Sequence, residues 1–154
     1  MADPFNDVQQ ALLSVLAADS NLTVDTKVSQ YAYGAPYPLP QWVDATKPVI
    51  AAEQAGAGLG SYKQFDDGAD EMVIKMHVLI YVRDPDPTVA EKTAQDFAYK
   101  VRNALQANPT LEVGGVEKCH TIKLTGFKLD KLADDDNITF IFTWFIDIYQ
   151  LVID

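Results

Sequence analysis

Few residues in this chain have the types and spacing that catalysis requires. The two histidines, His77 and His120, fall at opposite parities of strand-like runs. Cys119 directly precedes His120, and adjacent side chains on a strand point to opposite faces, so thiol and imidazole cannot form a nucleophile–base pair. We expect Cys119 to be a small core or sheet residue and each histidine to be a partly buried, hydrogen-bonded residue of a sheet.

Two other patterns resemble ligand-binding motifs without matching them. The acidic run 134–136, with Asp130 and Asn137 beside it, offers oxygen ligands but lacks the spacing of a calcium-binding loop, which favours a solvated turn. The glycine triplet within 56–60 has the wrong spacing for a phosphate loop and no helix start follows it. The sequence therefore predicts no catalytic residue, no metal site and no cofactor, and we expect a protein that is not an enzyme.

The composition is that of a folded protein of moderate size. Hydrophobic residues make up 48% of the 154 residues and charged residues 22%, which predicts one domain over residues 1–154. A net charge of −10 disfavours an electrostatic grip on nucleic acid or anionic lipid. No apolar run approaches the roughly 20 residues that span a bilayer, so we expect no membrane association.

The clearest elements lie in the middle of the chain. Residues 72–83 are rich in β-branched and aromatic side chains and predict a strand. From 88 to 105 the apolar residues recur at helical spacing. Asp86 can cap this helix, Pro87 suits its first turn, and Asn108-Pro109 ends it.

The segments before this centre predict a helix and less regular structure. Apolar spacing predicts a helix up to Ala18, and a short strand or an extended segment is expected within 22–33. An arm rich in proline and aromatic residues follows over 34–48, suited equally to docking on a partner or packing on its own domain. After a short strand at 47–53, the glycine-rich residues 54–70 predict a flexible loop that becomes ordered on docking.

The last third of the chain predicts a β-hairpin. Residues 118–129 and 137–153 alternate polar and apolar side chains, and 130–137 would form the solvated tip between them. Together the elements predict an α+β fold, with a mostly antiparallel sheet and both helices on one face.

The face expected under the helices carries Met72, Ile74, Met76, Val78, Ile80, Val82, Ile122, Leu124, Phe140, Phe142 and Trp144. The other face carries Lys75, His77, Arg83, Lys123, Thr139, Thr143, Asp147 and Tyr149 among Leu79, Ile141, Phe145 and Leu151. That second face is too apolar for water alone and suggests an interface or a lined channel.

Three stretches give this order of elements a resemblance to a known family. The strand 78–84 (VLIYVRD), the helix 87–107 and the closing strand 138–144 (ITFIFTW) resemble the tail terminator and related neck proteins of tailed bacteriophages. The resemblance is one of architecture over most of the chain, since this family has no invariant catalytic motif.

The resemblance implies a structural virion protein, made in the host cytoplasm, that assembles as a homo-oligomeric ring. Such rings are commonly hexamers at the head-proximal end of the tail tube, where they end tube polymerisation and bind the head connector or head-completion protein. DNA would pass through the lumen without specific binding. A different head–tail connector, head-closure or tail tube subunit stays an alternative, and a small-ligand-binding module is the weaker one.

The residues expected to contact other copies or partners come from the arm, the loop and the second sheet face. They are Tyr33, Tyr37, Trp42, Phe65, Lys75, His77, Arg83, Lys123, Thr143 and Asp147.

Overall fold

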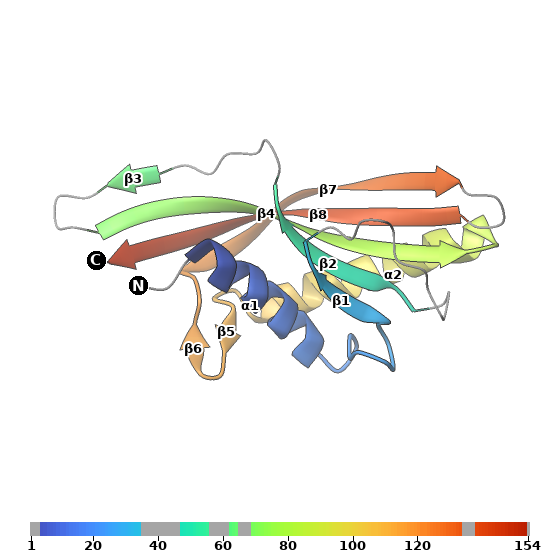
Figure 1. The fold of residues 1–154 in the computed structure, drawn as a ribbon, viewed down its shortest axis with the longest axis horizontal. Coiled ribbons are helices and arrows are strands. Elements are labelled where there is room, and N and C mark those ends of the chain that lie inside the picture. Colours follow the sequence, from blue (N-terminus) through green and yellow to red (C-terminus); the bar gives the residue numbers. More distant parts are fainter. Residues whose placement is uncertain (1–3, 35–46, 56–61, 65–68, 134–137, 154) are drawn as a thin grey trace.

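The computed structural model describes residues 4–34, 47–55, 62–64, 69–133 and 138–153 (Figure 1). In chain order the elements are α1 (Pro4–Ala18), β1 (Gln30–Tyr33), β2 (Val49–Gln54), β3 (Tyr62–Gln64), β4 (Ala69–Asp84), α2 (Pro87–Ala107), β5 (Glu112–Val113), β6 (Val116–Glu117), β7 (Thr121–Ala133) and β8 (Ile138–Ile153). Six strands form one sheet in the order β1-β2-β4-β8-β7, with β3 also pairing with β4. Within this sheet the pairing of β1 with β2 is parallel and the other pairings are antiparallel. A mostly antiparallel sheet with two helices confirms the predicted α+β class.

The sheet is built around β4 and β8. These two strands of 16 residues pair along their whole length, from Ala69 opposite Ile153 to Asp84 opposite Ile138. At the usual rise per residue each is about 50 Å long. Figure 1 shows both helices on the same face of the sheet, as predicted, and shows β3, the start of β4 and the end of β8 reaching beyond the helices.

Local signals set both ends of α2. The Asp86 side chain accepts a hydrogen bond from the backbone N–H of Thr88 at 2.9 Å, and Pro87 occupies the first turn. These features satisfy or remove donors that a helix start leaves unpaired. Asn108 caps the other end, where its amide donates to the carbonyl of Ala104 at 3.0 Å. The predicted helix is confirmed at both boundaries.

The main core lies between the helices and the sheet. α1 contributes Val8, Leu12 and Leu16, all fully buried, and its Gln9 amide donates to the carbonyl of Ala52 in β2 at 2.8 Å. The face predicted to lie under the helices does so. Ile74, Met76, Val78, Ile80, Val82, Phe140 and Phe142 are buried there, and Met72, Ile122, Leu124 and Trp144 pack against them half-buried.

Two local predictions need correction. The loop predicted over 54–70 contains β3, and β4 begins at Ala69, because three backbone pairs join these two strands. The hairpin tip predicted to begin at 130 begins later, because β7 stays paired with β8 as far as Ala133. Gly114 and Gly115, both with positive φ, close a small hairpin of β5 and β6. Most of the proline-rich arm, 35–46, lies outside the described residues.

Candidate interaction surface

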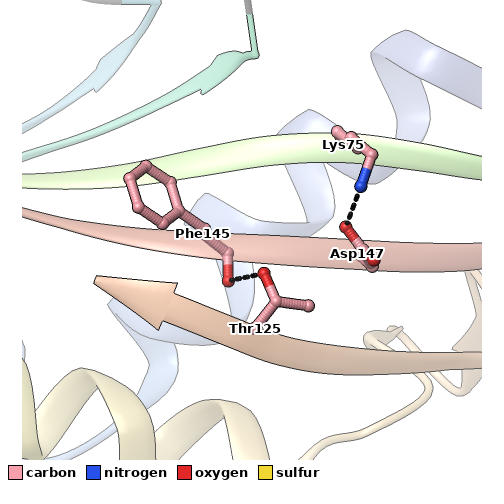
Figure 2. Close-up of polar contacts among 4 residues, drawn as sticks. All are labelled: Lys75, Thr125, Phe145 and Asp147. Atoms are coloured by element: carbon pink, nitrogen blue, oxygen red, sulfur yellow. Dashed lines mark hydrogen bonds and ion pairs between the residues drawn. The ribbon is translucent and has the colours of Figure 1, made fainter. Parts of the chain in front are cut away.

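We call the sheet face opposite α1 and α2 the outer face. A charged row crosses it where β4, β8 and β7 lie side by side. Asp147 stands opposite Lys75 on one neighbour and Lys123 on the other. The ammonium nitrogen of Lys75 is 3.1 Å from Oδ1 of Asp147 (Figure 2). The predicted grouping of these three residues on one face is therefore confirmed by the strand register.

His77 continues this surface toward β2. Its Nδ1 atom is 3.5 Å from Oε1 of Glu53, the residue opposite it on β2, and this contact is an ion pair only when the imidazole is protonated. On its other side, the His77 ring lies 5.0 Å from the Phe145 ring, centroid to centroid. The imidazole is thus held between a carboxylate and an aromatic ring, and can contribute charge or apolar area to a partner.

A β-bulge shapes the edge of this surface. Leu124 pairs with Ile146 and Gly126 pairs with Phe145, which leaves Thr125 as an extra residue on β7. Its hydroxyl donates to the carbonyl of Phe145 at 3.3 Å (Figure 2). A shallow hollow of about 240 Å³ opens beside it. The hollow is lined by Ala55, Lys75, Met76, His77, Thr125, Phe145, Ile146 and Asp147.

Toward the other end of the outer face, apolar side chains of β2 and β4 are buried. Val49, Ala51, Leu79 and Tyr81 form a second apolar cluster, with Ala32 and Ile141 packed against it. Burial, followed by the charge of Glu53, raises the pKa of Tyr81 to about 12. The outer face therefore has two parts, a buried apolar cluster and a partly exposed charged row.

The remaining predicted contact residues differ in accessibility. Thr143 is only 1% exposed, so in the free subunit it offers no surface to a partner, and its hydroxyl has no hydrogen-bond partner in the described part of the chain. Arg83 is half-buried opposite Thr139 at the end of β4. Neither stands in the row formed by Lys75, Asp147 and Lys123.

The aromatic residues of the prediction do not join this row. Tyr33 pairs with Ala52 of the main core, so it projects to the helix side, where its hydroxyl hydrogen-bonds Oδ1 of Asn6 in α1 at 2.6 Å. It is still 54% exposed. The other three, Tyr37, Trp42 and Phe65, lie outside the described residues.

Sequence reasoning missed two exposed apolar residues on β7. Phe127 is 62% exposed and Leu132 is 44% exposed. The bulge reverses the alternation after Thr125, so Phe127 stands opposite Trp144 on the helix side and Leu132 stands opposite Thr139 on the outer face. Gly126 was the available signal, because a glycine inside a strand pattern often marks a bulge.

Of the residues first considered for chemistry, His120 is exposed and lies just before β7, so the expectation that it belongs to the sheet is wrong. Cys119 is buried in the main core as predicted, and burial, with the charge of Glu117 added, raises the pKa of its thiol to about 12. The thiol therefore stays protonated at neutral pH and is a poor nucleophile. Across the ranges that the structure describes, no three His, Cys, Asp or Glu side chains stand close enough to hold a metal ion.

The fold and this surface define an α+β protein with one mixed sheet, two helices on one face, and a charged and apolar face opposite them. Neither helix in the described part is long and apolar enough to cross a membrane.

No protein-family model matches the chain, and no curated protein matches it. Among solved structures, it is similar to a chain from the virion of a native gene transfer agent particle, with a TM-score of 0.55 and 16% identity. The match covers 92% of this chain and 94% of the other. At that identity the two chains share a fold, and the shared fold spans nearly the whole length of both.

Proposed function

We propose that this protein is a structural subunit of a tailed-bacteriophage virion. It would form a ring at the head-proximal end of the tail tube, end tube polymerisation, and join the tail to the head connector. The observation that carries the proposal is the fold shared with a virion chain over 92% of this sequence. The resemblance of strands 78–84 and 138–144 and helix 87–107 to tail terminators gives the finer assignment.

The outer face supports an assembling role. The row of Lys75, Asp147 and Lys123 with His77 and Phe145 presents charge and apolar surface together around a shallow hollow. Interfaces between protein subunits combine these two kinds of surface. Residues with exposed apolar side chains, Phe127 and Leu132, add a second contact region at the sheet edge.

The net charge supports a position around passing DNA. At −10 the subunit carries an excess of carboxylates, and a ring of such subunits would repel the phosphate backbone over most of its surface. DNA could then move through the lumen without binding to it. The partners of the ring would be other copies of this chain, commonly six, the tail tube protein, and the head connector or head-completion protein.

The experiment that tests the proposal measures assembly alone and on tubes. Solution mass by light scattering and negative-stain images are recorded for the purified protein, and again after adding it to polymerising tail tube protein of the same virus. Closed rings of uniform size, and tubes that stop growing with a ring at one end, are the expected result. Open filaments would instead favour the alternative of a tail tube subunit.

A monomer that binds neither tubes nor connectors would overturn the proposal. The control is the same tube preparation without the protein, whose length distribution shows where growth stops on its own. A head-closure or connector protein would bind the head connector and leave tube length unchanged.

A further inference from the structure

The outer edge of β7 is the longest edge of the sheet in the described part of the chain. Its 13 residues pair with β8 on one side, and no described strand pairs on the other. Its backbone groups on that side are therefore available to a partner. Exposed Phe127 and Leu132 flank this edge on the two faces of the sheet, which gives a docking partner apolar area on both.

This edge has a charge opposite to that of the protein. β7 (residues 121–133) contains three of the twelve basic residues and one acidic residue, a net charge of +2. Since the whole chain carries −10, the remaining residues carry −12. Lys128 and Lys131 are both exposed and stand on opposite faces of the sheet. Lys128 lies opposite Thr143 on the outer face, 3.5 Å from Asp130, and Lys131 lies opposite Phe140 on the helix side. A positive edge on a strongly acidic subunit is complementary to the rest of a second copy.

An acidic hollow lies on another part of the molecule. It has a volume of about 530 Å³ and is lined by the end of α1, the cap of α2 and β5, with Asp19 and Glu112 among its residues. Both helices direct their C-terminal carbonyls to this region, and neither has a basic residue in its last turn. The partial negative charge of two helix C-termini adds to that of the carboxylates.

The hairpin beside this hollow places like charges opposite each other. Glu112 and Glu117 are cross-strand partners, both are exposed, and neither forms an ion pair with a described residue. A like-charge pair in this position destabilises a hairpin. A cationic partner would turn this cost into a favourable contact.

We propose that the outer edge of β7 binds the acidic hollow and β5–β6 hairpin of a second copy, with Lys128 and Lys131 facing Glu112 and Glu117. This deepens the proposed function, on which it rests, by naming the contact between neighbours in the ring. Figure 1 shows the end of β7 well separated from the β5–β6 hairpin, which lies below the sheet toward the other side of the molecule. One subunit therefore contributes the edge and the next contributes the hollow. Such a head-to-tail contact repeats until a ring closes.

The sharpest test neutralises the two glutamates. Glu112→Gln with Glu117→Gln removes the repulsion inside the hairpin, so the free subunit should unfold at the same or a higher urea concentration. The same change removes the acidic partner of the lysines, so self-association by analytical ultracentrifugation should weaken by roughly tenfold or more. If Glu112 and Glu117 had only a structural role, their replacement would not keep or raise stability while it weakened self-association.

The complementary test reverses the lysines. Lys128→Glu with Lys131→Glu should weaken self-association at least as much, and the matched control, Lys27→Glu with Lys92→Glu, makes the same charge change at exposed positions in a loop and on α2. The control should assemble as the wild type does, in buffers of about 0.1 M salt where exposed charges are only partly screened. Equal weakening by both pairs would show an effect of net charge and overturn the proposal.

Mixing the two variants tests the head-to-tail geometry. The glutamate variant keeps its β7 edge and the lysine variant keeps its hollow, so one contact can form between them and a ring cannot close. A heterodimer is expected, while each variant alone stays monomeric. Rings from the mixture or from either variant would overturn the inference while leaving the proposed function intact.

Wild-type rings that end tubes support that function, and a wild-type protein that never assembles overturns both. The inference would also be overturned if the wild type bound DNA, and if reversing the lysines abolished that binding while rings still formed.

Discussion

Gly126 on β7 stands opposite Phe145 on β8, one residue out of step with the neighbouring pair of Leu124 and Ile146. A Cβ atom at Gly126 would lie 3.5 Å from the Phe145 ring, an ordinary van der Waals contact. The extra residue between the two pairs is Thr125. It reverses which face each later side chain of β7 occupies, and so exposes Phe127 on the helix side and Lys128 on the outer face.

Deletion of Thr125 is therefore expected to be tolerated. Leu124 and Gly126 become neighbours and both keep their partners on β8, so no side chain changes face. The loss is the hydrogen bond to the Phe145 carbonyl, about 1 kcal/mol of stability. Urea unfolding followed by circular dichroism measures it.

Deletion of Thr143 is the control for that experiment. This residue sits in β8, which is paired on both sides without an extra residue, so its removal would move the rest of the strand to the wrong face. That variant should not fold. If the two deletions were equally damaging, the bulge would not have the role described.

The sequence predicts the elements whose signals are local. The strand at 72–83 and the helix closed by Asp86 and Asn108 are set by periodicity and caps, which act within a few residues. The bulge is different, because residues 120–125 alternate regularly and the break depends on how β7 pairs with β8. Gly126 indicates that a bulge is near, but the sequence around it does not say on which side of the glycine the extra residue lies.

The candidate surface, too, was predictable only where the signals are local. Lys75, His77 and Asp147 share a face because each lies on a long strand of regular parity. The contact between His77 and Glu53 depends on the register of β2 against β4, two strands far apart in the chain. No local pattern sets that register, and the same holds for the approach of β5–β6 to the ends of the helices.

Replacement of Asp86 by alanine should destabilise the fold by about 1 kcal/mol. Its carboxylate accepts the backbone hydrogen bond of Thr88 and lies at the positive end of α2. Thermal or urea unfolding gives the difference. Glu91→Ala, at an exposed position of the same helix, should change stability little, and a similar loss in both variants would argue against the cap.

Trp144→Phe should cost about 1–2 kcal/mol. The indole nitrogen donates to the carbonyl of Ala98 at 3.0 Å, which ties β8 to α2, and the ring packs against Phe127 and Phe142. Phenylalanine keeps part of the ring packing and loses the donor. Tyr99→Phe is the control, since Tyr99 is 62% exposed on the same helix and its change should have almost no effect. Equal unfolding midpoints for wild type and Trp144→Phe would show that the tie contributes nothing.

Stability should fall as pH rises above about 9, because of Cys119. Burial raises the pKa of its thiol from 9.0 to about 12 in the folded protein. Between these values the unfolded chain has released the proton and the folded chain still holds it, so raising the pH favours unfolding. The slope contributed is up to about 1.4 kcal/mol per pH unit, and it is absent below pH 9.

Urea midpoints of the wild type and of Cys119→Ala, measured between pH 7 and 10, separate this contribution from others. The alanine variant should lose part of the decline above pH 9, while Tyr81, whose pKa is raised to about 12, adds a decline in both proteins only as the unfolded tyrosine titrates near pH 10. A thiol reagent gives an independent reading at pH 8, because the folded wild type should react far more slowly than the urea-unfolded chain. Parallel declines of the two proteins with pH, together with rapid labelling of the folded chain, would show that Cys119 is neither buried nor held protonated.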